Sequence, residues 1–598
     1  MSNCFTFILE VDKLNFKLLI IVNNSEVEFR RRVERILLSG VMLPGQYIGG
    51  EFGSVVKRRE EVRGRFCFAF PDVYTIGMSN YGLQLLYAIM NRREDWSCER
   101  VFTPYPDMEA ALRANGLPLY SLETFTPLKE FDVLGFSLQY EMAFTNVLTI
   151  LDLGGVPIHC GERDMAFPLV VAGGPSAANP EPMSDFIDLF MIGDGEELLP
   201  AVCDGWLELK LGQNGLSRRE ALLEMGKRFQ GVVVPKFYSV HYQNNGLASC
   251  PQPTENGLPE VIRPVIVDDI ERFEPPVKRI VPLVECVHDR VSIEVMRGCP
   301  GRCKFCVSTV QKRPIRVRGV ESIVRIAGES VRATGSDEVS LLSLSTSDYP
   351  QLDLLLSRLR DVLLPYCVSV SVPSLRVNSQ LGGMVGQLTT ERTSGLTIAP
   401  EAARDEMRKK IGKPITNENL LSGCEAAFAN GFNRVKMYFL CGLPDESEAD
   451  IDGIVELSLE VMRLGKRVRG RVPIVTTNVS NFVPKPHSTW EREGMQPREY
   501  FSNVHSRLVN RVRRTGISLK YHTLETSFLE GLICRSDRRM CAIIERAWRL
   551  GARLDAWTDY FKFDYWQQAI NESGIDTTKI LNTTIPDHAE LPWGYVRY

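Results

Sequence analysis

In the first third of the chain, short apolar runs alternate with helix-like segments. Between residues 64 and 192, apolar runs such as Phe66–Phe70, Asp132–Ser137 and Pro168–Ala172 alternate with helix-like segments such as Tyr81–Met90. Strands that alternate with helices in this way predict a parallel sheet with helices on both faces. We therefore expect a Rossmann-like domain, whose ligands would bind beyond the carboxyl ends of the strands.

The same alternation returns between residues 291 and 485. About six strand–helix units can be recognised, fewer than the eight of a closed barrel. The pattern therefore predicts a partial, open (β/α)6 TIM-like barrel. Loops of such a barrel gather over the carboxyl ends of its strands. The predicted strands are Ser292–Met296, Glu338–Ser345, Cys367–Val372, Gly395–Ala399, Arg434–Leu440 and Ile474–Phe482.

A chain of 598 residues exceeds what one hydrophobic core holds, so several domains are expected. The overall class is α/β. We predict an N-terminal extension (1–60), the Rossmann-like domain (61–205), a connector with a small sheet (206–290), the barrel (291–490) and a mainly helical C-terminal region (491–598). A short strand-like run, Ile517–Tyr521, lies within the last of these.

Composition and charge limit the location and the partners. The chain is 44% hydrophobic and 24% charged, as in ordinary globular proteins. A net charge of −4 argues against broad nonspecific nucleic-acid binding, although not against a local basic groove, and we see no clear nucleic-acid signature. Fifteen scattered cysteines suit a reducing, cytoplasmic environment. The apolar run Phe16–Val22 is shorter than the roughly 20 residues of a membrane span, so we expect no membrane partner.

Three cysteines follow the first predicted barrel strand. Cys299, Cys303 and Cys306 have the spacing C-x3-C-x2-C, in a loop that Gly298, Pro300 and Gly301 separate from the strand. Three thiolates at this spacing suit three irons of a [4Fe–4S] cluster and leave the fourth iron open. The alternatives are a zinc knuckle with a distant fourth ligand, or three unrelated cysteines. Zinc usually takes paired ligand spacings, and no second pair follows here.

With these cysteines at the end of the first barrel strand, the chain resembles the radical S-adenosylmethionine (radical SAM) superfamily. The resemblance implies that the three cysteines bind a [4Fe–4S] cluster and that S-adenosylmethionine (SAM) chelates the fourth iron. It also implies an enzyme that reductively cleaves SAM to a 5′-deoxyadenosyl radical and modifies a substrate. A reductant such as flavodoxin or ferredoxin is then a partner. The substrate, a small molecule or a macromolecule, stays unknown.

The resemblance also suggests cofactor-binding residues at successive strand ends. Phe305 takes the family's aromatic position near adenine. Ser343 and Ser345 stand where relatives hold the methionine amino group with glycines, so this chain departs from the pattern there. The remaining candidates are Ser374, Arg376, Glu401 and the segment Gly442, Leu443 and Pro444, which matches the family's G-x-P-x-E motif.

The first domain resembles the cobalamin-binding-like domain that precedes the barrel in many radical SAM enzymes. Phe131–Glu141, Ala172–Pro175, Asn179–Pro182 and Ile192–Glu197 carry this resemblance. The cobalt-binding motif D-x-H-x-x-G is missing from the sequence, so cobalamin is an open alternative without motif support. Over residues 30–565 the chain is similar to a bacterial branch that combines both domains.

Two alternatives to the main hypothesis stay open. One is a non-catalytic iron–sulfur or zinc-binding interaction protein, and the other is a cobalamin-dependent radical methyltransferase. Methylthio transfer is disfavoured because the cysteines before the barrel do not form a second set of three. After the sixth barrel strand, Lys485 and His487 could touch the substrate, but a loop lysine and histidine are more often solvated, which is what we predict. For the arginines of Arg535–Arg539 we predict a salt-bridged, solvated face rather than a phosphate-binding patch.

Overall fold

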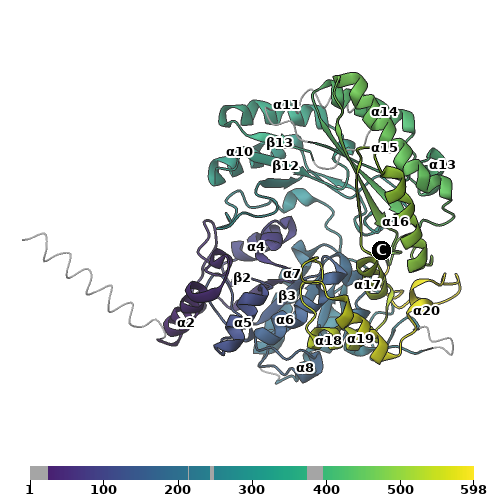
Figure 1. Cartoon of the computed structure of the whole chain (residues 1–598). Helices are drawn as coiled ribbons and strands as arrows, with labels where there is room; N and C mark the ends of the chain where they lie inside the picture. The colour runs from purple at the N-terminus through teal and green to yellow at the C-terminus, as the bar shows by residue number, and fades with distance from the viewer. Residues whose placement is uncertain (1–23, 213–214, 243–247, 373–394) are drawn as a thin grey trace, which may run out of the picture.

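The computed structural model describes residues 24–212, 215–242, 248–372 and 395–598 (Figure 1). The N-terminal domain lies at the bottom of Figure 1, the barrel lies above it, and the C-terminal helices (yellow) return to the N-terminal domain. The run Phe16–Val22 lies outside the described residues. Among the described residues, no helix is long and apolar enough to cross a membrane.

The predicted parallel sheet of the N-terminal domain is confirmed. Its described strands lie in the order β2-β1-β3-β4-β5-β6, and the first five are parallel. The chain order reverses between β1 and β3, which is the switch point where sheets of this kind bind ligands. The parallel strands are β1 (Gly64–Phe70), β2 (Trp96–Phe102), β3 (Val133–Ser137), β4 (Leu169–Gly173) and β5 (Leu189–Met191).

Burial explains why most of these strands read as apolar runs; β2 is the exception, with the buried polar residues Ser97, Glu99 and Arg100. Every residue of β1 and β2 is buried, as expected where helices cover both faces. The helices α4 (Tyr81–Arg92), α6 (Phe144–Leu153) and α7 (Gly195–Leu211) alternate with the strands. Part of the predicted connector also joins this domain, because β6 (Val232–Val233) pairs antiparallel with β5.

All six predicted barrel strands are present, in two parallel sheets. The first has the order β13-β12-β9 and the second β14-β15-β16-β17. The segment predicted at 517–521 is β17, and it extends the second sheet by pairing parallel with β16. The strands are β9 (Val291–Glu294), β12 (Glu338–Leu342), β13 (Ser369–Ser371), β14 (Leu396–Glu401), β15 (Arg434–Cys441), β16 (Ile474–Asn481) and β17 (Ser518–Tyr521).

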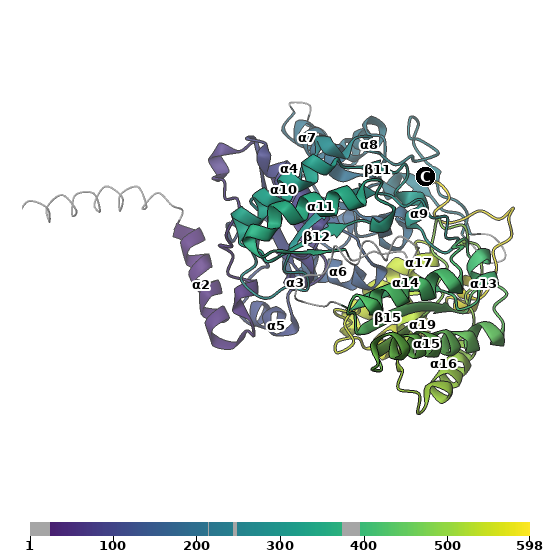
Figure 2. The ribbon, with the colours of Figure 1, turned by 90° about the horizontal axis from the view of Figure 1, so that it is seen from above.

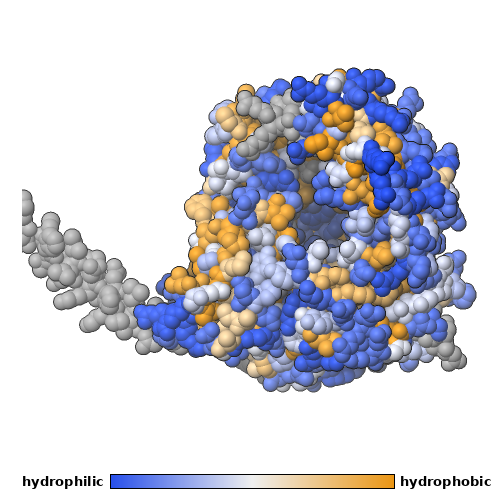
Figure 3. All heavy atoms as spheres, in the orientation of Figure 1, coloured by the Kyte–Doolittle hydropathy of each residue, from blue (hydrophilic) through white to orange (hydrophobic). Residues whose placement is uncertain are grey.

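Among the described helices, those packed on the second sheet cover one of its faces. The buried residues Val435 and Met437 of β15 alternate with the exposed residues Arg434, Lys436 and Tyr438. Figure 2 shows the covering helices α14 (Asn417–Ala429), α15 (Glu448–Arg469) and α16 (Arg498–Val512) together on this side of the molecule. The opposite face of the sheet borders a deep hollow between the two sheets (Figure 3).

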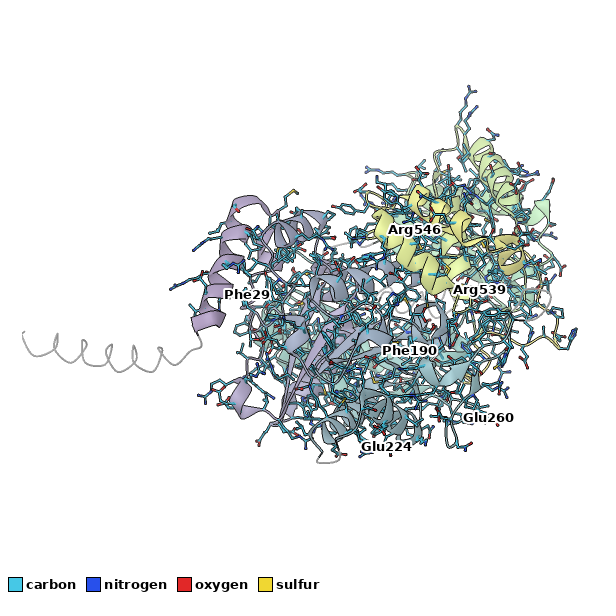
Figure 4. All side chains as sticks on the ribbon, turned by 90° about the horizontal axis from the view of Figure 1, so that it is seen from below. Phe29, Phe190, Glu224, Glu260, Arg539 and Arg546 are labelled. Carbon is cyan, nitrogen blue, oxygen red and sulfur yellow. The ribbon has the colours of Figure 1, made fainter. Side chains whose placement is uncertain are left out.

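The C-terminal helices pack against the N-terminal domain. They are α17 (Leu524–Arg535), α18 (Met540–Leu550), α19 (Phe563–Ser573) and α20 (Thr577–Leu581). The Nε1 of Trp548 on α18 donates to Oγ1 of Thr149 on α6 at 3.0 Å. Figure 4 shows these yellow helices, with Arg539 and Arg546, beside the domain that contains Phe190.

The prediction of a salt-bridged, solvated face is wrong for Arg535, whereas Arg538 and Arg539 are ion-paired as predicted. Arg535 is 4% exposed and donates to the backbone carbonyls of Ile580 and Glu491. Arg538 forms an ion pair of 3.1 Å with the fully buried Glu181 of the N-terminal domain. Arg535 thus links segments of the C-terminal region, and Arg538 links that region to the N-terminal domain, which charge patterning along the sequence does not reveal.

Candidate functional site

The three cysteines of the C-x3-C-x2-C motif lie in a loop between β10 (Met296–Arg297) and α9 (Ser308–Gln311). All three are partly exposed, whereas most other described cysteines are buried. Gly298 begins the loop with φ +98°, and a Cβ at this position would lie 2.6 Å from the carbonyl oxygen of Lys312. Only glycine therefore permits this sharp exit from the strand.

The second sheet holds the cysteine loop from the opposite side. The backbone N–H of Lys304 donates to the carbonyl of Ile411 at 2.9 Å, and Trp490 N–H donates to the carbonyl of Lys304 at 3.1 Å. Gly412 has φ +80°, and a Cβ there would lie 2.4 Å from the carbonyl oxygen of Arg302. The loop thus fits closely between segments that follow β14 and β16.

Phe305 joins the cysteine loop to three strand ends. It packs, partly buried, against an apolar cluster that includes Leu443 after β15 and Phe482 after β16. This cluster brings together Phe305 and Leu443, two residues predicted from distant motifs. We call this group the strand-end cluster; its other members are Ala402, Met407, Ile411, Leu440 and Trp490.

Ser343 and Ser345 form a hydrogen-bonded turn after β12. The Oγ of Ser343 lies 3.0 Å from Oγ1 of Thr346 and accepts the N–H of Ser345 at 3.2 Å. The Oγ of Ser345 donates to Asp348 at 2.6 Å. Both serines are buried, so their hydroxyls shape the turn in this structure. Ser374 and Arg376 lie outside the described residues.

Glu401 ends β14 in a left-handed conformation, with φ +67°. Its Oε1 accepts from Nζ of Lys413 at 3.1 Å. Burial raises the pKa of Glu401, and the ammonium of Lys413 opposes that rise. Lys413 also donates to the carbonyl of Ala399, so it ties the strand end to the segment after α13 (Asp405–Lys410).

Gly442, Leu443 and Pro444 form the turn after β15. Gly442 has φ +83°, and its N–H donates to Oε2 of Glu446 at 2.6 Å. The hydroxyl of Tyr500 donates to the same oxygen at 2.6 Å. Burial raises the pKa of Glu446 to about 7. The glutamate of the G-x-P-x-E motif therefore organises the turn from within.

A cavity of about 460 Å³ separates the cysteine loop from the N-terminal sheet. Its walls combine the middle of β1 (Phe66 and Phe68) and the carboxyl ends of β3, β4 and β5 with Arg297, Gly298 and Ser343 of the barrel. Five glycines in or just after the strands contribute to the wall on the side of the N-terminal sheet. They are Gly135, Gly173, Gly174, Gly193 and Gly195.

Comparison with known proteins identifies both halves of this site. Residues 82–235 match the family described as "Radical SAM proteins, N-terminal", and residues 293–458 match the "Radical SAM superfamily". The second match contains all three cysteines. The chain belongs to the radical SAM superfamily.

Similar proteins cover large parts of this radical SAM chain. The Methanocaldococcus jannaschii protein named Uncharacterized protein MJ0966 is 24% identical over 433 residues, which are 71% of this chain and 83% of that protein. The cobalamin-dependent radical enzyme OxsB, solved with aqua-cobalamin, is 11% identical with a TM-score of 0.45, over 81% of this chain and 66% of its own. A radical SAM methyltransferase from Sphaerobacter thermophilus is 17% identical with a TM-score of 0.26, over 39% of this chain and 66% of its own.

The donor set and the shape of the loop fit an iron–sulfur cluster. Three accessible thiols in one loop are the ligands that such clusters take. Within the described residues, no three Cys, His, Asp or Glu side chains are arranged around a single metal ion. A cluster requires thiolates on three different irons, so its ligands stand further apart than those of one ion.

An ion cluster that the sequence did not suggest joins the radical SAM barrel to the N-terminal domain. Arg297, two residues before Cys299, pairs with Asp194 at 3.1 Å and with Glu196 at 2.6 Å. Arg316 pairs with the other oxygen of Asp194. Although burial opposes it, Arg297 and Arg316 lower the pKa of Asp194. The segment Ile192–Glu197 is the one signal that could have indicated this contact.

A second, smaller cavity of about 250 Å³ adjoins the first and reaches Val307, next to Cys306. Lys485 lines it and pairs with Glu141 at 2.9 Å and with Glu530 at 2.8 Å. Nearby, Nε2 of His487 lies 2.9 Å from the carbonyl of Ala178, and burial lowers the pKa of His487. The prediction that Lys485 and His487 are solvated is therefore wrong.

Proposed function

We propose that this radical SAM enzyme holds a [4Fe–4S] cluster on Cys299, Cys303 and Cys306 and uses SAM to modify its substrate. The observation that supports the proposal best is the position of the three thiols. They lie, accessible, in a glycine-bounded loop that faces the ends of both barrel sheets. When bound, the reduced cluster supplies the electron that cleaves SAM and yields a 5′-deoxyadenosyl radical, which takes a hydrogen atom from the substrate.

The side chains around the loop would bind and shield SAM. Phe305 and Leu443 offer an apolar surface for adenine, and the turn from Gly442 to Pro444 offers backbone groups. Ser343, Ser345 and Glu401 supply polar groups at neighbouring strand ends. The strand-end cluster excludes water from one side of this space, which protects a reactive radical from side reactions.

Metal analysis tests which residues hold the cluster. After anaerobic reconstitution, we expect about four irons and four sulfides per chain. Alanine at Cys299, Cys303 or Cys306 should lower both contents severalfold, since each thiolate holds one iron. Cys367→Ala, which removes an exposed cysteine outside the loop, should leave them unchanged. Zinc without sulfide would contradict the proposal and favour the interaction protein.

A second candidate function is radical methyl transfer with cobalamin, and the cavity of about 460 Å³ at the switch point favours it. No histidine contributes to the described walls of this cavity, so the protein would offer no histidine to the cobalt. Open space beside glycine-lined strand ends would receive the cofactor.

Blocking the cavity tests this second candidate. A Cβ on Gly173 would meet only Met191, at 3.6 Å and 4.0 Å, so Gly173→Leu should fill space without breaking the sheet. We expect wild-type protein to retain hydroxocobalamin through gel filtration and Gly173→Leu to lose most of it. Gly161→Leu, at a position with nothing within 4 Å, is the matched control. Equal retention by both variants, or none by the wild type, would exclude cobalamin from this cavity.

A further inference from the structure

Three separate segments of the second half of the barrel are basic and contain no acidic residue. Residues 430–440, 461–475 and 509–523 together contain eleven lysines and arginines but no aspartate or glutamate. The whole chain, in contrast, has 70 basic and 74 acidic residues. The eleven are Arg434, Lys436, Arg463, Lys466, Arg467, Arg469, Arg471, Arg511, Arg513, Arg514 and Lys520.

The sheet order brings these segments to one edge of the molecule. The first segment leads into β15, the second into β16 and the third into β17. These three strands are adjacent and parallel, so the amino ends of the strands lie along one edge of the sheet. Arg434 pairs in register with Ile474, and Thr476 with Ser518. Neighbouring strands lie about 5 Å apart, so the three strand starts span only about 10 Å. We call the eleven residues the basic edge.

Most of this charge is not neutralised within the protein. Among ion pairs between described residues, Arg511 is the one member of the basic edge with partners, Asp452 at 3.3 Å and Glu456 at 3.0 Å. Ten of the eleven side chains are exposed, and Arg469 is half-buried. Concentrated positive charge without partners attracts polyanions and is weakened by salt.

The charge continues from the edge onto the open face of the sheet. Lys436 and Tyr438 lie on the face of β15 that α14 and α15 leave uncovered, which borders the hollow in Figure 3. Tyr438, Asn478 and Lys520 form one row across β15, β16 and β17. Tyr438 is 38% exposed and offers a ring on which a base can stack beside the cations.

We propose that the basic edge binds the phosphate backbone of a single-stranded nucleic acid and directs it along β15 into the hollow of the barrel. Arginine predominates in the basic edge, and its planar guanidinium group matches phosphate oxygens in pairs. A flat membrane surface would reach the edge but not Lys436 or Tyr438 inside. The proposal rests on the proposed function only in taking the bound nucleic acid to be the substrate of the enzyme.

Fluorescence anisotropy with a labelled RNA of about 20 nucleotides tests the surface on the full-length, reconstituted protein. We expect an association constant whose logarithm falls linearly with the logarithm of the salt concentration. Replacing Arg467, Arg471, Arg513 and Arg514 together by glutamine should weaken binding at least tenfold and reduce the slope by about 3, since each phosphate contact contributes about 0.7.

A second quadruple variant controls for the change in net charge. It replaces Arg58, Arg228, Arg325 and Arg546 by glutamine; these are exposed arginines of other elements, and Arg546 is visible in Figure 4. This control should bind within about twofold of the wild type. Equal weakening in both variants would overturn the proposal, as would the absence of binding near physiological salt.

Three competing ligands separate the possible partners. Single-stranded DNA of the same sequence shows whether the sugar matters, and either outcome supports a nucleic-acid surface. Tighter binding to polyglutamate, or to vesicles of phosphatidylglycerol, would contradict it in favour of an acidic protein or a membrane. Because the assay needs neither SAM nor reductant, its failure is distinguishable from a failure of SAM cleavage.

Discussion

Glu446 shows how a single side chain shapes the turn predicted to hold adenine. One of its oxygens accepts both the N–H of Gly442 and the hydroxyl of Tyr500, each at 2.6 Å. Burial raises its pKa to about 7, from a usual value of 4.5. The folded protein therefore keeps this carboxyl protonated at pH values where the unfolded chain has lost the proton. The resulting stabilisation is complete below pH 4.5 and is lost as the pH rises through 7.

Glutamine at position 446 should remove this pH dependence. It keeps a carbonyl oxygen for Gly442 but cannot ionise, so Glu446→Gln should gain on the wild type by about 1.4 kcal/mol for each pH unit between 4.5 and 7. Unfolding temperatures of both proteins at pH 5, 6 and 7.5 measure this gain. Glu448→Gln, which removes an exposed carboxylate two residues further on, controls for the lost charge. A difference that stays constant with pH would refute the assignment.

At the scale of elements, the cysteine loop depends on a close contact with the segment after α13. Gly412 has φ +80° and leaves no room for a Cβ beside the carbonyl of Arg302. Alanine there must push the loop away, because the obstacle is backbone rather than a flexible side chain. The N–H of Lys304, between Cys303 and Cys306, would then lose its hydrogen bond to Ile411.

Gly412→Ala should therefore retain less than half of the wild-type iron after reconstitution. Gly470→Ala is a matched control, because Gly470 has a similar φ of +71° but nothing within 4 Å. The control should lose only about 1 kcal/mol of stability, from the left-handed backbone, and keep its iron. The iron content per chain, measured on both variants in parallel, tests this prediction. If both retain wild-type iron, the loop does not depend on this contact.

The sequence predicted the elements and the cysteine motif well because both are local signals. Short apolar runs identified β1, β3 and β4 and the six barrel strands, and the spacing C-x3-C-x2-C identified the loop. Contacts between distant segments were not predictable. The buried position of Arg535, the ion pair between Arg538 and Glu181, the ion pairs of Lys485 and the pairing of β17 with β16 all depend on how the domains fold together.

At the scale of the whole molecule, Asp194 links the N-terminal domain to the base of the cysteine loop. It pairs with Arg297 at 3.1 Å and with Arg316, and all three side chains are at most 11% exposed. Removing one partner from a buried ion group leaves charge without compensation, which costs about 3 kcal/mol. Because Arg297 lies two residues before Cys299, loss of its ion pair with Asp194 should also disturb the cysteine loop.

Asp194→Asn should lower the unfolding temperature by several degrees and reduce iron retention. Asp204→Asn provides the comparison, since Asp204 pairs with Arg93 within the N-terminal domain and is 29% exposed. We expect the comparison variant to lose about 1 kcal/mol at most and to keep its iron. Calorimetry and iron analysis on both proteins measure the two effects. Iron loss in the Asp204 variant alone would contradict the proposed link.

The formation of 5′-deoxyadenosine tests the central claim most directly. Reconstituted protein is mixed anaerobically with SAM and dithionite, and the product is quantified by chromatography. The account predicts that the wild type and Cys367→Ala release 5′-deoxyadenosine, and that Cys303→Ala releases at most about 1% as much, since a missing thiolate removes the cluster. Release at the wild-type rate by Cys303→Ala, or none by wild type loaded with four irons, would contradict it.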